Sequence, residues 1–132
     1  METALRAALI DHLRADDALT EVVNVVDEAE TERASTPWLA LVASAAIDWS
    51  TKKRPGREVR VAFELRLHGD DPAAGADIAG QVDARVLSLP AAQTGFRVVT
   101  AHFLRGRAER GERNTRALLR EYRFRVLETP QP

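Results

Sequence analysis

Cysteine is absent from this sequence, so neither a disulfide bond nor a cysteine-ligated metal can hold the fold together. The chain of 132 residues is long enough to bury about two-thirds of the surface that its unfolded form exposes, so it needs no such staple. A long apolar stretch is also missing: the opening METALRAALIDHL carries charges every few residues, unlike a signal peptide or a membrane anchor. We expect one soluble domain over residues 1–132, made in the cytoplasm without membrane association, ordered over about 4–127 and frayed over 128–132.

Sequence motifs for catalysis and for metal binding are missing as well. The histidines His12, His68 and His102 show neither H-x-x-H nor H-E-x-x-H spacing, and no serine lies in a G-x-S-x-G context. The segment from Gly75 to Gly80 lacks the following Lys-Ser/Thr that a phosphate-binding loop needs. We therefore expect a protein that is not an enzyme and that holds no metal or cofactor.

One acidic pair leaves an alternative open. Asp70 and Asp71 offer the carboxylates that Mg²⁺ prefers, although a strand-to-helix turn with a capping aspartate explains the same residues. A small ligand-binding or enzymatic α+β domain would have to assemble its site from Asp70, Asp71, His68 and His102. A divalent metal that raises the melting temperature would favour this alternative, because specific binding stabilises the folded state.

Acidic and basic side chains nearly cancel, giving a net charge of −1, but they are distributed unevenly along the chain. Residues 1–36 carry nine acidic side chains against three arginines, and residues 97–125 carry nine arginines against three glutamates. Two interpretations remain open: two solvated surfaces, or an acidic face of one copy that contacts a basic face of the next. A head-to-tail contact of the second kind generates a ring when its rotation closes.

Apolar spacing predicts the elements of the N-terminal third. A helix capped by Thr3 is indicated by the i, i+3, i+4, i+8 spacing of its apolar residues Leu5, Ala8, Leu9 and Leu13. Asp16 or Asp17 is expected to cap a short second turn over ALTEVV. The polar NVVDEAETERASTP predicts a brief extended piece and an exposed loop, and the apolar PWLALVASAAI predicts a strand buried on both faces.

The rest of the chain alternates between strand and helix patterns. EVRVAFELRLHG has period two and predicts a strand with one face on the core, whereas AAGADIAGQVDARVLSL predicts a helix that Pro90 ends. The strands GFRVVTAHFL and LLREYRFRVLE follow, separated by the Arg/Gly-rich loop RGRAERGERNTR. The order α-β-β-α-β-β predicts an α+β fold, a single mostly antiparallel four-stranded sheet with two main helices packed on one face.

Two basic segments lie at the expected hairpin tips and are the candidate contact sites. Their residues are Lys52, Lys53, Arg54 and Arg57 in the first, and Arg105, Arg107, Arg110, Arg113 and Arg116 in the second. The second segment has no aromatic residues on which bases could stack, and two glutamates dilute its charge, so we expect no specific nucleic-acid site there. A strongly salt-dependent affinity for DNA would favour the nucleic-acid alternative.

Six phrases occur in a characteristic order between Ala4 and Leu127: LRADDALTEVV, TPWLALVAS, VRVAFELRLHG, AGADIAGQVDARVLSL, GFRVV and YRFRV. In this order the sequence resembles the tail-completion (tail-terminator) proteins of phages and gene transfer agents, a family formerly described as a domain of unknown function. The chain departs from the family at Asn24-Val25-Val26, where members commonly show an arginine-led R-I-Y.

The resemblance implies a structural protein of the virion tail of a phage or phage-like particle. Such a protein forms a ring, usually of six copies, at the head-proximal end of the tail tube, where it stops tube polymerisation and offers a surface for head joining. Its partners would be further copies of itself, the major tail tube protein and the head–tail connector protein, with DNA passing through the ring lumen. Sheet edges and hairpin tips could then pair across subunits. Another head–tail connector or neck protein is the alternative in the same class.

Overall fold

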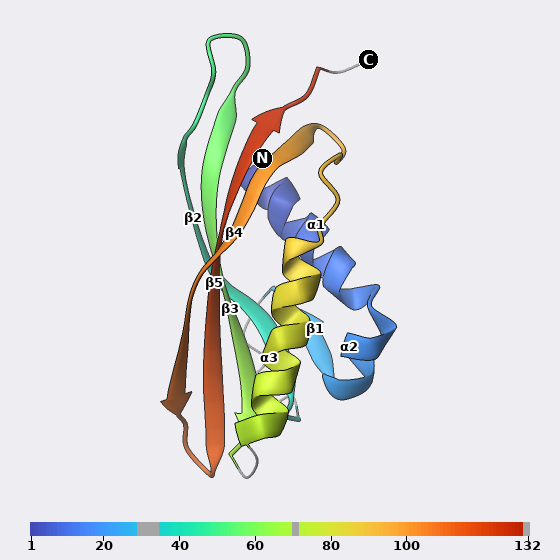
Figure 1. Ribbon diagram of the computed structural model, residues 1–132, viewed down its shortest axis with the longest axis vertical. Coiled ribbons are helices and arrows are strands. Elements are labelled where there is room, and N and C mark those ends of the chain that lie inside the picture. The colour runs from blue at the N-terminus through green and yellow to red at the C-terminus, as the bar shows by residue number, and fades with distance from the viewer. Residues whose placement is uncertain (29–34, 70–71, 131–132) are drawn as a thin grey trace.

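A computed structural model describes residues 1–28, 35–69 and 72–130. These residues form one sheet and three helices (Figure 1). The strands lie in the order β1-β2-β3-β5-β4 across the sheet. The elements are α1 (Glu2–Arg14), α2 (Asp17–Val22), β1 (Val25–Asp27), β2 (Trp38–Asp48), β3 (Gly56–His68), α3 (Pro72–Leu87), β4 (Phe96–Arg110) and β5 (Thr115–Glu128).

The sheet in the described residues has five strands and is mixed, so the predicted four-stranded sheet is wrong in one strand. The extra strand is β1, which pairs parallel with the start of β2 through Val25 opposite Trp38 and Asp27 opposite Ala40. Its three residues are too short for an alternating pattern, which is why the sequence indicated only a brief extended piece. The four long strands pair antiparallel with one another, as predicted.

The core lies between the sheet and the helices, where β3 and β5 contribute their alternate apolar residues. Phe63, Tyr122 and Phe124 are fully buried, and the rings of Phe63 and Tyr122 meet edge to face with centroids 6.1 Å apart. The period-two patterns of both strands are thereby confirmed. Burial of large apolar and aromatic side chains on one face of the sheet supplies the main favourable term of folding.

Helices α1 and α3 pack on this same face. The stripe Leu5, Leu9 and Leu13 of α1 is fully buried, as are Val82 and Val86 of α3. The first helix begins at Glu2 with Met1 at its N-cap, two residues before the predicted cap Thr3. No helix among the described residues has an apolar stretch long enough to cross a membrane.

Two expectations about the ends of elements also meet the structure. Asp16 caps α2 as predicted, because its carboxylate accepts hydrogen bonds from the amides of Ala18 (3.1 Å) and Leu19 (3.3 Å). Helix α3 ends at Leu87, three residues before Pro90, which agrees with the predicted stop. The acidic loop at 29–34 and the capping pair Asp70 and Asp71 lie outside the described residues.

The predicted Arg/Gly-rich loop is mostly strand. β4 continues to Arg110 and β5 begins at Thr115, so the connection is a tight turn in which Arg113 and Asn114 have φ angles of 55° and 60°. Thr115 donates its amide to the carbonyl of Glu112 at 3.1 Å, which makes this a type I′ turn. Strand β2 was also expected to be buried on both faces, but only Trp38–Leu41 is, and residues 43–48 are largely exposed.

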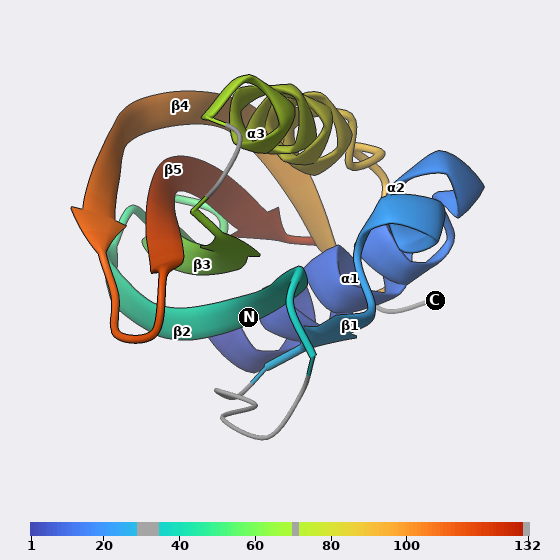
Figure 2. The ribbon, with the colours of Figure 1, turned by 90° about the horizontal axis from the view of Figure 1, so that it is seen from below.

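The two long hairpins project from opposite ends of the molecule. In Figure 1 the β2–β3 turn lies at the top of the long axis and the β4–β5 turn at the bottom. The view along that axis shows a strongly curved sheet, with α1 and α2 gathered at one side (Figure 2). The sheet face opposite the helices, here called the open face, carries the other alternate residues, such as the exposed Arg60 and His102.

Candidate assembly interface

The first basic segment is an exposed turn with a defined shape. Its lysines Lys52 and Lys53 and the adjoining Arg54 are exposed at the β2–β3 tip. The hydroxyl oxygen of Thr51 accepts hydrogen bonds from the backbone amides of Lys53 (3.3 Å) and Arg54 (3.0 Å), and these bonds fix the conformation of the turn. Arg57 lies inside β3, where its guanidinium contacts Asp48 of β2 at 3.3 Å. Three of the four predicted residues therefore form the tip, and the fourth supports its base.

The second basic segment is spread along a strand pair rather than gathered in a loop. Arg105 lies toward the middle of β4 and donates two hydrogen bonds, of 2.7 and 3.2 Å, to Glu121 of β5. This contact lowers the pKa of the Glu121 carboxyl, chiefly through its hydrogen bond with the guanidinium. Arg107 contacts Glu109 at 2.8 Å on the same strand. Arg105 and Arg107 are therefore paired side chains of the open face.

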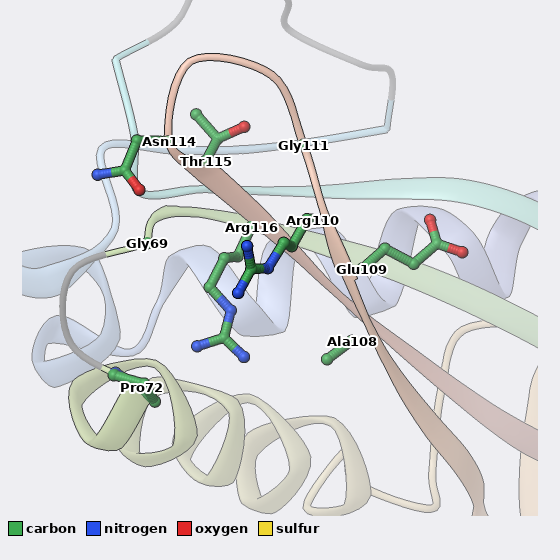
Figure 3. Close-up of a pocket in the computed structure, with 9 residues that line it drawn as sticks. All are labelled: Gly69, Pro72, Ala108, Glu109, Arg110, Gly111, Asn114, Thr115 and Arg116. Atoms are coloured by element: carbon green, nitrogen blue, oxygen red, sulfur yellow. The ribbon is translucent and has the colours of Figure 1, made fainter.

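The other three arginines of this segment lie at the hairpin end. Arg110 and Arg116 stand opposite each other where β4 meets β5, and Arg113 is in the turn itself. Figure 3 shows the side chains of Arg110 and Arg116 directed toward the space between the hairpin and Pro72, at the start of α3. This space is a depression of about 780 Å³, lined also by Gly69 and Asn114. Neither Arg110 nor Arg116 forms an ion pair with a described residue.

The structure thus separates the two predicted segments. The β2–β3 tip and the β4–β5 tip occupy opposite ends of the long axis (Figure 1), so they do not form one continuous patch. Exposed acidic side chains are present elsewhere on the molecule, at Asp17 and Glu21 of α2. Nothing in the described residues pairs these acids with the basic tips inside one copy.

The open face between the tips is held by ion pairs and ring contacts that sequence spacing does not reveal. Glu58 of β3 is 9% exposed and accepts a 3.0 Å hydrogen bond from Arg125 of β5. The guanidinium of Arg125 also lies over the ring of Trp49, 5.6 Å from its centroid. At the other end of the face, Glu64 contacts Arg66 at 2.7 Å. These contacts order charged side chains on a surface that no described helix covers.

A second polar cluster joins α3 to the sheet on the helix side. Asp83 of α3 accepts hydrogen bonds from the Arg120 guanidinium, one of them 3.0 Å from Nε, and from the Tyr122 hydroxyl at 2.5 Å. The guanidinium of Arg120 lies over the ring of Phe103, 4.5 Å from its centroid. Burial, reinforced by the hydrogen bond to Asp83, raises the pKa of the Tyr122 hydroxyl. This cluster is a structural brace, because every polar group in it is directed at another.

The histidines are not brought together. His68 is at the end of β3 opposite Thr115, and His102 is on β4 opposite Arg123. Eight residues of β5 separate these two levels, a distance of about 26 Å. His12 is on α1 and contacts the hydroxyl of Ser88 at 2.9 Å. Among the described residues no group of three or more acidic or histidine side chains could hold a metal ion.

The alternative site of Asp70, Asp71, His68 and His102 therefore cannot form as a single site, because His68 and His102 are too far apart to bind the same ligand. Asp70 and Asp71, its other two residues, lie outside the described residues. The open face and the two basic tips remain as the surfaces that can contact other molecules. Sequence patterns found the tips by their charge but not the open-face ion pairs or the Asp83 brace.

Comparison with known proteins places the chain among phage tail components. Residues 7–127 match the family model described as "Tail completion protein gp17". A chain of the "Virion of native gene transfer agent (GTA) particle" is 24% identical, with a TM-score of 0.81 and 96% of each chain covered. The "bacteriophage SPP1 gp17 protein" is 22% identical, with a TM-score of 0.69 and coverage of 93% of this chain and 88% of that one. No curated protein sequence matches the chain.

Proposed function

Because the chain belongs to the tail completion protein gp17 family, whose members are structural tail proteins and not enzymes, we propose that it completes the tail of a phage or phage-like particle. In this proposal several copies, six in the expected case, form a ring on the head-proximal end of the tail tube. The ring ends tube polymerisation and offers the surface to which the filled head is joined. Its place is the virion tail, after assembly in the host bacterial cytoplasm.

The observation that carries the proposal is the position of the two basic tips at opposite ends of the long axis (Figure 1). A terminating ring has two different neighbours, the tube on one side and the head–tail connector on the other. A subunit with a separate projecting contact at each end fits that requirement. The tip of Lys52, Lys53 and Arg54 and the tip of Arg110, Arg113 and Arg116 are the proposed contacts.

The charge of the tips is suited to recognition by protein partners. Arginine and lysine at exposed turns accelerate encounter with acidic surfaces and fix orientation more than they add affinity. The β2–β3 tip extends beyond the helices, and the β4–β5 tip lies at the other end of the molecule beside the start of α3 (Figure 1), so a partner can reach each tip without disturbing the core. DNA passing through the lumen would contact them, if at all, without sequence reading, since no aromatic residues lie in either tip.

The first experiment is size-exclusion chromatography with light scattering, on the protein alone and with the tail-tube protein encoded beside it. A ring of about six copies, alone or on addition of tube protein, is the expected result. A monomer that ignores the tube protein would overturn the proposal. A ring that binds a portal or connector but not the tube would favour the alternative of a neck protein.

The tips are tested by charge reversal in two matched variants. We expect Arg110→Glu with Arg113→Glu and Arg116→Glu to leave the monomer folded and to abolish assembly at one end. Replacing Lys52, Lys53 and Arg54 by glutamate should abolish a different contact at the other end. Circular dichroism and melting temperature control for folding. If both variants assemble like the parent protein, the tips are not the contact sites.

A further inference from the structure

The two outer strands of the sheet leave much of their backbone without a neighbour. β1 covers β2 only along Trp38–Ala40, so the outward edge of residues 41–48 has no backbone partner within the described part of the chain. On the other side, residues 91–93 bond only to Phe96 and Val98, at the start of β4. The outward edge of residues 99–110 is therefore also bare in the structure as described. Unpaired strand edges template pairing with another chain.

Soluble proteins usually protect such edges with lysine, proline or charge, and here the protection is missing over one window of each strand. Residues 41–47 of β2 read LVASAAI, without a charge or a proline, and Ile47 is 61% exposed. Residues 98–104 of β4 read VVTAHFL, again without acid, lysine, arginine or proline. Val99 and Phe103 in this stretch are 45% and 40% exposed. Each strand thus presents an uncharged, partly apolar edge to solvent.

The two bare windows lie at the same level of the sheet. Ala45 pairs with Arg60, Arg60 with Arg123, and Arg123 with His102, so Ala45 and His102 stand on one line across four strands. By the same pairings residues 43–47 of β2 are level with residues 100–105 of β4. The windows would therefore meet if the β4 edge of one copy came beside the β2 edge of another.

Outside these windows both edges are protected, and at matching levels. The part of β2 that β1 covers, Trp38–Ala40, is level with Arg107–Glu109 of β4, where every second side chain is charged. Protection by a covering strand on one edge coincides with protection by charge on the other. This coincidence leaves a single stretch, on each edge, that is open to a partner.

Strand direction points to the same partner. β2 is antiparallel to β3, β3 to β5, and β5 to β4, so β2 and β4 run in opposite directions. A second copy placed in the same orientation would bring its β2 antiparallel to this β4 and continue the alternation of the sheet. We propose that residues 43–47 of β2 and 100–105 of β4 pair in this way, so that the sheet continues from each subunit to the next. The proposal rests on the ring of the proposed function and names its subunit contact.

Head-to-tail pairing uses both edges of every copy, which is what a closed ring requires. An isologous pair of two β2 edges would instead make a dimer and leave both β4 edges bare. Backbone hydrogen bonds across the joint would supply contact strength independent of side-chain identity. All helices would then lie on one side of the ring wall and all open faces on the other.

The absence of native cysteine allows a direct test by disulfide trapping. The double variant Ala45→Cys with His102→Cys places one thiol in each window. Within one copy the two positions are three strand spacings apart, about 14 Å, whereas a disulfide needs Cα atoms closer than about 7 Å. Any disulfide formed is therefore between copies. Thr100→Cys and Arg105→Cys, each combined with Ala45→Cys, cover the neighbouring registers.

We expect oxidation of the assembled protein to give a ladder of linked subunits on a non-reducing gel for at least one double variant, with no linkage in the single variants. Linked dimers from Ala45→Cys alone would show two β2 edges in contact and overturn the proposal. A ring that forms normally but links in none of the three registers would also overturn it, while leaving the proposed function intact. Absence of any ring with tube protein would instead remove the proposed function.

A second test blocks the edge instead of linking it. Ala45→Lys with Ile47→Lys adds two charges to the exposed window of β2, and lysine on an edge strand opposes pairing. The matched control is Ala18→Lys with Val22→Lys on α2, where two exposed apolar residues away from both edges receive the same two charges. We expect the edge variant to stay folded and to raise the concentration needed for assembly by at least about tenfold, with no change in the control. Unchanged assembly of the edge variant would contradict the proposal.

Discussion

Removing the carboxylate of Asp83 should destabilise the fold strongly, because this one group joins α3 to two side chains of β5. The carboxylate of Asp83 accepts hydrogen bonds from the guanidinium of Arg120 and from the hydroxyl of Tyr122. The side chains of Arg120 and Asp83 are only 20% and 24% exposed. The variant Asp83→Ala leaves the hydroxyl of fully buried Tyr122 without an acceptor. A buried group that loses its partner costs about 1–3 kcal/mol, and a hydrogen bond to a charged group contributes about 1.5–3 kcal/mol.

These contributions overlap, because Arg120 can turn partly toward water while still lying over the ring of Phe103. We therefore expect a loss of about 2–3 kcal/mol in the free energy of unfolding. For 132 residues the entropy of unfolding is about 0.28 kcal/mol per kelvin, so the melting temperature should fall by about 7–11 °C. Thermal unfolding followed by circular dichroism measures this directly. The matched control is Asp77→Ala, an exposed aspartate of the same helix, which should leave the melting temperature unchanged.

A double-mutant cycle separates the brace from general damage to α3. Tyr122→Phe removes the hydroxyl that Asp83→Ala leaves unpaired, so the two changes together should cost less than the sum of each alone. The expected coupling is about 1 kcal/mol or more. Strict additivity, or a loss for Asp83→Ala no larger than for Asp77→Ala, would refute the reasoning that Asp83 satisfies two buried partners at once.

Two further predictions concern stability. Because burial raises the pKa of Tyr122 above its ordinary value of 10.0, the folded state keeps a proton that the unfolded chain loses above about pH 10. The free energy of unfolding should thus fall as the pH rises above about 10, by up to about 1.4 kcal/mol per pH unit. In Tyr122→Phe it should fall less steeply. Urea unfolding at several pH values measures both, and the same dependence on pH in the two proteins would contradict the prediction. Gly80→Ala should raise stability by about 0.5–1 kcal/mol, since an added Cβ meets no atom within 4 Å, whereas Gly75→Ala should gain less because its Cβ would lie 2.8 Å from Leu67 Cδ1. Melting temperatures of the two variants decide the order.

The parts of the fold that the sequence predicts are those whose residues face both core and solvent along their length. β3 and β5 alternate because one side of each covers the core, and α1 shows its stripe because one side packs on the sheet. β1 escapes prediction because three residues cannot show a period. The far half of β4 escapes because both of its sides are exposed from Arg105 to Arg110, so no apolar alternation marks it as a strand.

The same reasoning explains the outcome for the candidate interface. The concentration of charge identifies the two basic segments. A strand that carries arginine on both faces has the composition of a loop, however, so the sequence predicts a loop over residues 105–116 where the structure has two strands and a tight turn. The turn contains Arg113 and Asn114 at positive φ, without the glycine that usually marks such a turn. The brace of Asp83 with Arg120 joins residues 37 positions apart, and no spacing rule connects a helix with a strand at that separation.

Two tips at opposite ends of one subunit have a consequence for the order of events in assembly. In the proposed ring each tip is repeated by symmetry, so a partner with matching symmetry is held by many copies of the same contact. Linked contacts of this kind multiply avidity by about 10²–10⁴ without any new interaction. In such a ring each single contact could be weak, and an isolated subunit would not trap free tube protein. Strong attachment would arise only once the ring had closed, which would tie the completion of a tail to the completeness of the ring itself.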